Sequence, residues 1–572
     1  MKLVIAEKPS VGVAIAKVIG ANKRKDGYFE GNGYLVSWCV GHLVRMANPD
    51  KYDEKYAKWK MEDLPIFPEE FLYELNPKTK KQFHLLKKLM AEKQVDTIIN
   101  ACDAGREGEL IFRLVYQQAK CKKPIQRLWI SSMEDEAIKA GFQNLRKGTD
   151  YESLFESAQA RSMADWLVGM NLSRLYSCLY NQNYSVGRVQ TPTLNMIVKR
   201  DSEIEKFVKE KYFTVEIQGL EISLSTERID DYQVAEQLRN LIDEKIIITD
   251  VENKEKMTRP DKPYDLTTLQ REANKVFGYS AKKTLDITQK LYEKKLVTYP
   301  RTDSRFLTED MKEQVKHLLF QLEDDYPLDE TSFASIFNDS KVSDHYAIIP
   351  TISGHQSELS KLSLDEKNIY HLIQAKLLMA SSKPLRESTT KIIYEYDKFT
   401  FTASGKTVID KGFKKYDLKK KEAKEKILPN LLSGDELEVL DVVIQEKFTK
   451  PPQHFTEDTL LKAMAKAGTE SLDKDIEVER LGLGTPATRA SIIENLICKG
   501  FVERDKKNLL ATHKGIALVA IVAEEFKSAE TTSNWEVKLS DIAKGELSKD
   551  EFLDEIKRTI KETIDLYEKA KE

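Results

Sequence analysis

Cysteine is scarce in this chain and never clustered. The five cysteines, Cys39, Cys102, Cys121, Cys178 and Cys498, are far apart among 572 residues. Without a CxxC pair, the sequence encodes neither a zinc ribbon nor a redox dithiol. No apolar run is long enough to span a bilayer, and the N-terminus lacks the basic segment and cleavage site of a signal peptide. We therefore expect reduced thiols, no membrane association and a cytoplasmic location.

An excess of charge of one sign is also missing. Charged residues make up 32% of the chain and hydrophobic residues 41%, yet the net charge is −3. This balance is typical of a folded, charge-rich protein and excludes one whose whole surface is basic. A local basic patch would still suffice for nucleic-acid binding. At this length we expect several domains.

The N-terminal residues 1–150 alternate short apolar strands with helices. Lys2–Ala6 and Val95–Asn100 are typical of strands, and helices are expected over Val11–Ile19 and from Gly108 to Val115. Such alternation predicts an α/β domain with a parallel sheet.

The rest of the chain changes repeatedly between helical and strand-like patterns. We expect helices at 151–210, strands at 211–264, helices at 265–390, strands at 391–455 and helices at 456–572. The separated strand-like stretches are expected to pair with each other, so the chain would leave its domains and return to them. The predicted fold class is a multidomain α/β plus α and β protein, and we expect a monomer.

Acidic residues follow both N-terminal strands. Glu7 follows the first strand, and Asp103 follows the second within DAGREGE, which also holds Glu107 and Glu109. Ligands in such sheets gather at the carboxyl ends of strands, and Mg²⁺ takes one or two carboxylates while keeping waters for a phosphate. Acids in a first helical turn also favour the helix dipole. We favour a metal site for Glu7 with Asp103 and leave both interpretations open for Glu109.

This arrangement resembles a Toprim domain, which topoisomerases, primases and some nucleases share. The acidic motif of that family usually reads D-x-D-x-E, and here Gly105 replaces the second aspartate. The resemblance leaves Glu7, Asp103 and Glu107 as the candidate Mg²⁺ ligands. Whether one or two metal ions bind stays open.

A tyrosine and an arginine flank Pro300 in the segment LVTYPRTDS. Tyr299 and Arg301 are two residues apart, so in an extended segment both side chains point the same way. A tyrosine that attacks phosphorus conserves the energy of the broken bond for resealing, and no ATP is needed. Forming the phenolate at neutral pH costs about 4 kcal/mol, which Arg301 can offset by holding the phosphate. Simple packing is the alternative for any one of the 23 tyrosines.

TYPRTDSR resembles the active-site motif of the type IA DNA topoisomerases. Four further segments resemble that family in the same order: ARSMADWLVGMNLSR (Ala160–Arg174), SVGRVQTP (Ser185–Pro192), DHYAIIPT (Asp344–Thr351) and GLGTPATRASII (Gly482–Ile493). The resemblance spans the chain from Lys2 to about residue 560. The wording of DAGREGEL and TYPRTDSR is similar to the topoisomerase III branch.

The resemblance implies a fold and an activity. The fold would be a Toprim domain with a toroidal core that opens as a gate. The enzyme, an isomerase, would cut one DNA strand through a 5′-phosphotyrosine, pass another strand and reseal the break. It would relax negatively supercoiled DNA or decatenate DNA that has single-stranded regions, without ATP, and nothing supports RNA as a substrate.

The resemblance also assigns roles to single residues. Lys8 would contact the scissile phosphate and protonate the leaving 3′ oxygen, with Glu7 as the rival acid. His345 would place the phosphate or relay a proton. The remaining catalytic candidates are Tyr299 and Arg301. The DNA-binding candidates are Arg301, Trp59, Arg161, Asp165, Arg174, Ser185, Val186, Gly187, Arg188, Val189, Gln190 and Arg489.

Two of these assignments have simpler alternatives. Arg161 and Asp165 are spaced to form a salt bridge along one helix, and Trp59 could pack in the core. Arg174 is thirteen residues after Arg161 and falls on another face of a straight helix. Either the helix breaks near Gly169–Ser173, or the two arginines have separate tasks.

Other functions are weaker interpretations of the same residues. A tyrosine recombinase would carry its tyrosine near the C-terminus, and a Toprim nuclease or primase would leave Tyr299 unexplained. A catalytically inactive Toprim-containing DNA-binding subunit is favoured by Gly105 alone. The SGKT at Ser404–Thr407 invites a phosphate-loop interpretation, but Thr400 stands where that loop needs glycine, so we expect no ATP binding.

Overall fold

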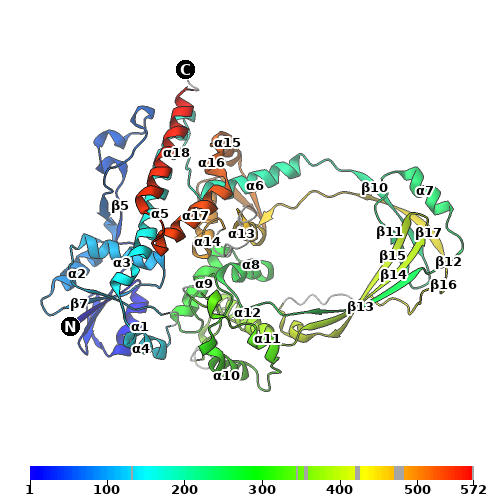
Figure 1. The fold of residues 1–572 in the computed structure, drawn as a ribbon, viewed down its shortest axis with the longest axis horizontal. Coiled ribbons are helices and arrows are strands. Elements are labelled where there is room, and N and C mark those ends of the chain that lie inside the picture. The colour runs from blue at the N-terminus through cyan, green and yellow to red at the C-terminus, as the bar shows by residue number, and fades with distance from the viewer. Residues whose placement is uncertain (131–132, 343–344, 353–358, 419–424, 469–481, 570–572) are drawn as a thin grey trace.

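The chain folds into a ring with a globular block on one side, as a computed structural model shows (Figure 1). The structure describes residues 1–572 except 131–132, 343–344, 353–358, 419–424, 469–481 and 570–572. Within the described residues, every helix is too short or too polar to cross a membrane.

A seven-stranded sheet with order β2-β3-β4-β1-β7-β8-β9 forms the N-terminal block. At its centre, β1 (Lys2–Ala6) lies parallel to β4 (Tyr34–Trp38) and β7 (Thr97–Ala101), and β7 pairs in parallel with β8 (Ile125–Arg127). The outer strands, which pair antiparallel, are β2 (Lys23–Lys25), β3 (Tyr28–Gly31) and β9 (Arg146–Lys147). The predicted parallel sheet is therefore confirmed at the centre, whereas the edges are antiparallel.

Helices cover both faces of this sheet, which explains why its central strands are continuous apolar runs. In β1, Val4 packs with one pair of helices and Leu3 and Ile5 pack with the other. The helices on the first face are α1 (Pro9–Ile19) and α4 (Asp135–Gln143), and those on the second are α2 (Lys80–Ala91) and α3 (Arg106–Gln118). All carboxyl ends of the parallel strands thus point to one edge.

A long helix, α5 (Glu152–Tyr180), connects this block to the rest of the molecule. It is unbroken over 29 residues and ends where Asn181 adopts a left-handed conformation with φ 47°. The expected helical stretch 151–210 is thus interrupted after Tyr180, and α5 has no break at Gly169–Ser173. Helix α5 packs in one hydrophobic core with α6 (Gln190–Glu205), α13 (Glu457–Lys466), α14 (Pro486–Cys498), α15 (His513–Ile521), α16 (Glu524–Lys527), α17 (Ala529–Lys544) and α18 (Lys549–Lys569). Three short strands, β18 (Phe455–Thr456), β19 (Val502–Asp505) and β20 (Asn508–Ala511), pair beside it.

A hairpin-like segment from the N-terminal block runs beside α5 (Figure 1). It begins and ends with the paired strands β5 (Val44–Met46) and β6 (Tyr73–Leu75). Trp166 of α5 donates a hydrogen bond to its Ala47 carbonyl at 3.1 Å, and Asn171 accepts one from its Ile66 amide at 2.6 Å. These contacts hold the segment that carries Trp59 beside α5.

A six-stranded antiparallel sheet forms the far side of the ring. Strand β10 (Lys211–Gln218) pairs with β17 (Asp441–Phe448), and β11 (Ser223–Thr226) pairs with β15 (Phe399–Asp410). These pairings confirm the predicted association of strands far apart in the chain. The other elements are β13 (Asp250–Thr258), β14 (Leu385–Tyr396), a two-stranded sheet of β12 (Lys245–Ile247) and β16 (Glu436–Glu438), and α7 (Tyr232–Asn240). Residues Ser404–Thr407 lie inside β15, where a phosphate loop has no place.

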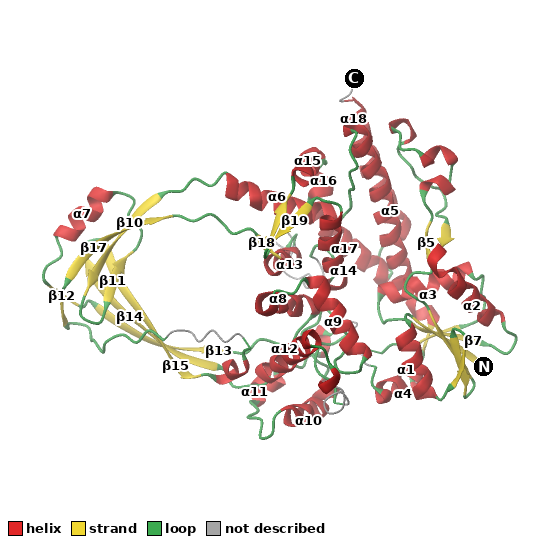
Figure 2. Ribbon diagram, turned by 180° about the vertical axis from the view of Figure 1, so that it is seen from behind, coloured by secondary structure: helices red, strands yellow, loops and turns green. Residues whose placement is uncertain are grey.

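The remaining helices close the ring between this sheet and the N-terminal block (Figures 1 and 2). They are α8 (Leu266–Phe277), α9 (Ala281–Glu293), α10 (Lys312–Leu322), α11 (Glu330–Ala334) and α12 (Leu364–Ala380). Helix α8 packs against α13, and buried residues of α9 and α12 share a hydrophobic cluster with α1. The architecture is the toroidal one that the motifs predict.

Candidate active site

Two carboxylates lie together at the carboxyl ends of β1 and β7. Glu7 is 4% exposed, and its Oε2 accepts a hydrogen bond from the Asp103 amide at 3.3 Å. Burial and the charge of Asp103 raise the pKa of Glu7 to about 7. A buried and a half-buried acid that repel each other would be stabilised by a divalent cation, and carboxylate oxygens suit Mg²⁺. The residues present therefore fit the expected metal.

The third expected ligand points to a different partner. Glu107 lies in the first turn of α3, and its Oε1 is 2.5 Å from His42 Nε2. That hydrogen bond lowers the pKa of the Glu107 carboxyl. Among the described residues, no three His, Cys, Asp or Glu side chains are gathered around a single metal position. Glu107 would have to leave His42 to join a cation at Glu7 and Asp103.

Two glycines shape the acidic loop. Gly105 caps α3 with φ +151°, and a Cβ there would meet nothing within 4 Å. The conformation favours glycine, and no side chain takes the place of the aspartate usual in the family. A Cβ on Gly108 would lie 2.0 Å from the Asp103 carbonyl oxygen. Glycine at that position lets α3 approach the end of β7 closely.

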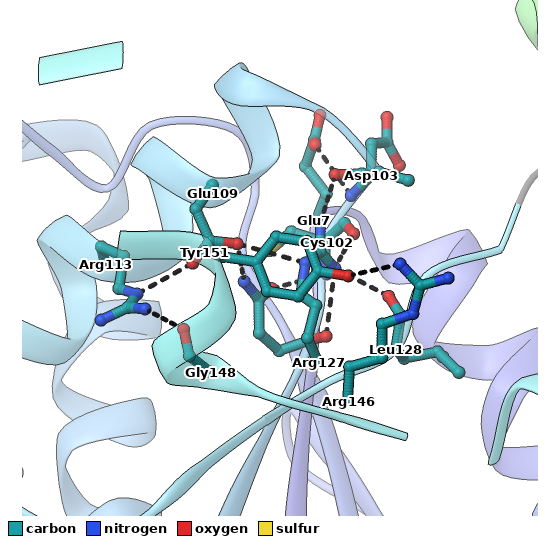
Figure 3. Close-up of polar contacts among 12 residues, drawn as sticks. Glu7, Cys102, Asp103, Glu109, Arg113, Arg127, Leu128, Arg146, Gly148 and Tyr151 are labelled. Atoms are coloured by element: carbon teal, nitrogen blue, oxygen red, sulfur yellow. Dashed lines mark hydrogen bonds and ion pairs between the residues drawn. The ribbon is translucent and has the colours of Figure 1, made fainter. Parts of the chain in front are cut away.

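Buried arginines hold this loop from below (Figure 3). Arg127 donates hydrogen bonds to the carbonyls of Asn100, Cys102 and Asp103 at 3.1, 2.7 and 2.8 Å. Its Nε is 3.1 Å from Glu109, which also accepts a hydrogen bond from Arg113 at 2.8 Å. Glu109 is 1% exposed. Of the two interpretations left open for Glu109, the structure thus favours a structural one, as the centre of a buried ion pair.

Tyr299 reaches the acids from the other side of the ring. Its hydroxyl donates a hydrogen bond to Asp103 Oδ2 at 2.9 Å, and its ring is 4.2 Å from the ring of His345. Burial and the charge of Asp103 raise the pKa of Tyr299 well above its ordinary value, and Arg301 opposes that shift. In this closed arrangement Tyr299 is therefore protonated.

The two basic neighbours of Tyr299 are placed differently. Nε of Arg301 is buried and has no hydrogen-bond partner in the described part of the chain, so the guanidinium can receive a phosphate. Nε2 of His345 is 2.6 Å from the Ala104 carbonyl. Because a carbonyl only accepts, this nitrogen carries the proton. Asp344, the first residue of its motif, lies outside the described residues.

A cleft of about 710 Å³ collects these groups. Its lining includes Glu7, Asp103, Glu107, Tyr299, Arg301 and His345. Thr485 and Thr488, which cap the start of α14, line it as well. Lys8 is not part of the lining; it caps α1, and its charge lowers the pKa of Glu7.

A groove of about 840 Å³ continues from this cleft. Arg161 and Asp165 line both cavities. In the segment Ser185–Gln190, the half-buried Ser185, Gly187 and Gln190 line the groove with polar and backbone atoms. The segment also contributes Val186 and Val189, which are 3% and 9% exposed and pack in the hydrophobic core.

Arg188 belongs to a buried charge network rather than to the groove surface. It is 5% exposed and donates to Asp165 Oδ1 and to Glu536 Oε1 of α17, each at 2.8 Å. Arg106 and Arg161 each lie 3.6 Å from the same Glu536 carboxylate. Burial alone would raise the pKa of Glu536, but the three guanidinium groups hold it well below its usual range. Asp165 thus pairs with Arg188, and the salt bridge expected within α5 is absent from the described ion pairs.

Three other residues that were expected to contact DNA have clear surroundings in the structure. Arg174 is 3% exposed, donates to the Tyr56 carbonyl at 2.8 Å and lies 5.4 Å over the ring of Trp59. Trp59 is 45% exposed and lines the groove, so the core-packing alternative is wrong. Arg489 is buried and bonded to the Leu483 carbonyl and to the Thr267 hydroxyl, and burial lowers its pKa to about 10. Arg174 and Arg489 therefore support the site from within.

The sequence motifs missed several of these residues: His42, Arg127, Lys499, Lys514 and Glu536. One signal was available for Glu536, because it lies among Thr532, Trp535, Leu539 and Ile542, which form the buried face of α17. A charge on the apolar face of a helix indicates a buried partner. The lysines carry no such signal, since their surroundings come from other segments.

Comparison with known proteins identifies the class. A family model described as DNA topoisomerase matches residues 149–554, and one described as Toprim domain matches residues 2–133. The chain belongs to the type IA DNA topoisomerases. It is accordingly an isomerase of DNA topology rather than a Toprim nuclease or an inactive DNA-binding subunit.

Similar proteins narrow the branch. The chain is 42% identical to DNA topoisomerase 3 of Bacillus licheniformis, over 98% of this chain and 81% of that protein. It is 41% identical to DNA topoisomerase 3 of Bacillus subtilis with the same coverage. Full-length topoisomerase I from Thermotoga maritima has a similar structure, with a TM-score of 0.76 at 23% identity over 98% of this chain and 90% of that one. The sequences support the topoisomerase III branch, and the structure confirms the fold.

Proposed function

We propose that Tyr299 is the nucleophile of a Mg²⁺-dependent, ATP-independent reaction on single-stranded DNA segments. The observation that carries this proposal is the hydrogen bond from Tyr299 to Asp103, which joins the tyrosine of one part of the ring to the acids of another. A tyrosine with a purely structural role would not need three ionisable groups, the buried Glu7 and the half-buried Asp103 and Arg301, around one cleft.

The proposed reaction is a balanced exchange of esters. The Tyr299 oxygen attacks phosphorus and loses its proton to Asp103, the acceptor already 2.9 Å away. The bond from phosphorus to the 3′ oxygen breaks, so the 5′ phosphate stays on Tyr299 and a 3′ hydroxyl is released. Arg301 binds the phosphate and stabilises the charge of the transition state. Resealing reverses the same steps.

The leaving 3′ oxygen needs a proton, and we propose that Glu7, rather than Lys8, donates it. Glu7 lines the cleft, and a pKa of about 7 lets it carry a proton at neutral pH. Glu107 would then hold Mg²⁺, with Asp103 and Glu7 as further ligands whenever they are ionised. When bound, Mg²⁺ supplies positive charge beside the scissile phosphate.

Strand passage requires the ring to open where Tyr299 meets the N-terminal block. The contacts there include Tyr299 with Asp103, His345 with the Ala104 carbonyl, and the ion pair of Lys295 with Asp135. These polar contacts exchange readily for water, and the apolar contacts of α1 with α9 and α12 have to part as well. We propose that they separate after cleavage and that a monomer completes the cycle.

A plasmid assay tests the nucleophile. Wild-type protein is expected to relax negatively supercoiled plasmid with Mg²⁺ and without ATP, and denaturation during the reaction should leave protein on the 5′ end of the nicked strand. Tyr299→Phe should lose both activities. Tyr292→Phe is the matched control, since that buried ring lies 5.4 Å from the ring of Tyr299 and should retain most activity. Relaxation that survives in Tyr299→Phe would exclude the covalent mechanism.

A further inference from the structure

Two lysines from the C-terminal part of the chain enter the groove. Lys499 caps the end of α14 and Lys514 lies in the first turn of α15. Both line the groove, and neither lines the catalytic cleft. Lys499 Nζ donates to Ser185 Oγ at 2.7 Å and lies 3.3 Å from Gln190 Oε1. Lys514 Nζ donates to the Lys499 carbonyl at 3.1 Å.

A simpler role for Lys499 would be to complement the dipole at the end of its own helix. Its ammonium group instead reaches another segment, where Ser185 and Gln190 accept hydrogen bonds from it. Lys514 lies 4.8 Å over the ring of Phe501, so its stem and head are also held beside the groove. Both ammonium groups are thus fixed by contacts that a mobile surface lysine lacks.

These two positive charges have no acid to balance them. In the described part of the chain, neither lysine has a carboxylate within ion-pairing distance. Asp165 is the one acid among the described groove residues, and it pairs with Arg188. Burial and the nearby charge of Lys514 lower the pKa of Lys499, as expected for a site that an anion would relieve.

We propose that Lys499 and Lys514, with Ser185 and Gln190, form a subsite that binds a backbone phosphate of the single strand away from the scissile position. This inference rests on the proposed function for its ligand. No groove residue comes from 265–390, the part that carries Tyr299. When the ring opens, the subsite therefore stays with the N-terminal block and retains the strand end that Tyr299 does not hold covalently.

Salt dependence of binding gives the first test. Anisotropy of a labelled single-stranded oligonucleotide is followed in the Tyr299→Phe background, so that no cleavage occurs. Each neutralised phosphate contributes about 0.7 to the slope of log affinity against log salt. Because both lysines bind the same phosphate, the double variant Lys499→Gln with Lys514→Gln should reduce the slope by about 0.7, and each single variant by less. The arginine variants at both positions should keep the wild-type slope.

A lysine outside the groove serves as the matched control. Lys88 is exposed on α2, and Lys88→Gln should leave the slope unchanged. A double variant with the wild-type slope would overturn the subsite, and so would weaker binding at every salt concentration with an unchanged slope, which indicates a distorted groove. A further result to look for is that inorganic phosphate binds at the lysines while the slope for the oligonucleotide is the same in the variants and in wild type. That result would indicate a general anion site and would also overturn the proposed subsite.

Retention of the cut strand gives the second test. With Mg²⁺ and an active Tyr299, the double Gln variant should release the non-covalent product fragment faster than wild type on native gels. Unchanged release would contradict the assigned role. The slope experiment needs no catalysis. If the variants change the slope but the protein never relaxes plasmid, the proposed function fails while this inference stands.

Discussion

The catalytic cleft and the groove beside it are assembled in opposite ways. The cleft takes its acids from the ends of β1 and β7 and takes Tyr299 with Arg301 from the segment that follows α9. The groove takes α5, the segment before α6, and α14 from a single hydrophobic core. In the proposed reaction, the parts that separate meet through polar contacts and through the cluster that α1 shares with α9 and α12, whereas the groove is built on one body.

Their electrostatics differ in the same sense. In the cleft, like charges lie close: the pKa of Glu7 is raised, and Arg301 keeps a buried nitrogen without a partner in the described residues. Beneath the groove, the carboxylates of Glu536 and Asp165 are paired with three arginines. Strain at a reacting site is tolerated because the surrounding structure supplies stability. The comparison teaches that the acids of the cleft repel each other and await a ligand, whereas the charges beneath the groove are mostly paired, although Nη2 of Arg188 has no partner among the described residues.

Breaking the groove floor should have the largest effect on stability. Glu536→Gln removes the charge that three guanidinium groups share, and loss of one partner from a buried network costs about 3–5 kcal/mol. Asp103→Asn, by contrast, relieves repulsion on Glu7 and should leave the free energy of unfolding equal or higher while abolishing relaxation. Urea denaturation of both variants measures this. Equal stabilities would refute the comparison.

Removing Arg301 should slow strand cleavage far more than it weakens DNA binding. Arg301→Ala is expected to lower the rate of strand cleavage by about 10²–10³-fold, as for the loss of one group that stabilises transition-state charge. Affinity for a single-stranded oligonucleotide should change little, because the groove lies on the other body. Single-turnover cleavage and anisotropy separate the two effects. Arg301→Lys keeps the charge without the planar fork and should recover part of the rate.

The acids should also give the cleft a pH dependence that the groove lacks. Glu7 has a folded-state pKa of about 7 against an ordinary value of 4.5. Between these values the folded protein binds this proton more tightly than the unfolded chain, so without metal its stability falls as pH rises through that window. Mg²⁺ should then stabilise more at pH 8 than at pH 6. Thermal denaturation with EDTA or Mg²⁺ tests this, and Glu7→Gln should flatten the profile.

Trp59 should show the smallest effect. A base that stacks on an aromatic ring contributes about 1–3 kcal/mol, but Arg174 already lies over this ring. We therefore expect Trp59→Ala to weaken oligonucleotide binding by about 1 kcal/mol, the lower end of that range. Competition binding against wild type measures it. A loss as large as that of the double lysine variant would show that stacking, rather than charge, holds the strand.

Local patterns were enough to predict much of the fold. The strand Lys2–Ala6 is an apolar run, and the position of Glu7 at its end follows from the strand itself. The antiparallel edges were missed because β2, β3 and β9 are short and polar. Their pairing is decided by neighbours rather than by their own sequence.

The site divides in the same way. Tyr299 and Arg301 share one short segment, so their motif identifies both at once. Arg188 looks like a surface residue in SVGRVQTP, but its partner Glu536 lies 348 residues further along the chain. Burial of a charge depends on such distant partners, and no spacing rule within a segment reveals them. Lys499 and Lys514 escaped notice for the same reason.

The contact between Tyr299 and Asp103 also bears on how the protein behaves when no DNA is bound. An enzyme that cuts DNA should not react when DNA is absent. In the proposed reaction the phenol stays protonated, because burial raises its pKa, and it is a poor nucleophile until a DNA phosphate enters and Arg301 is engaged. Asp103 then accepts the proton. Idle molecules would thus be inert by default, and reactivity would arise only together with the strand that is to be cut.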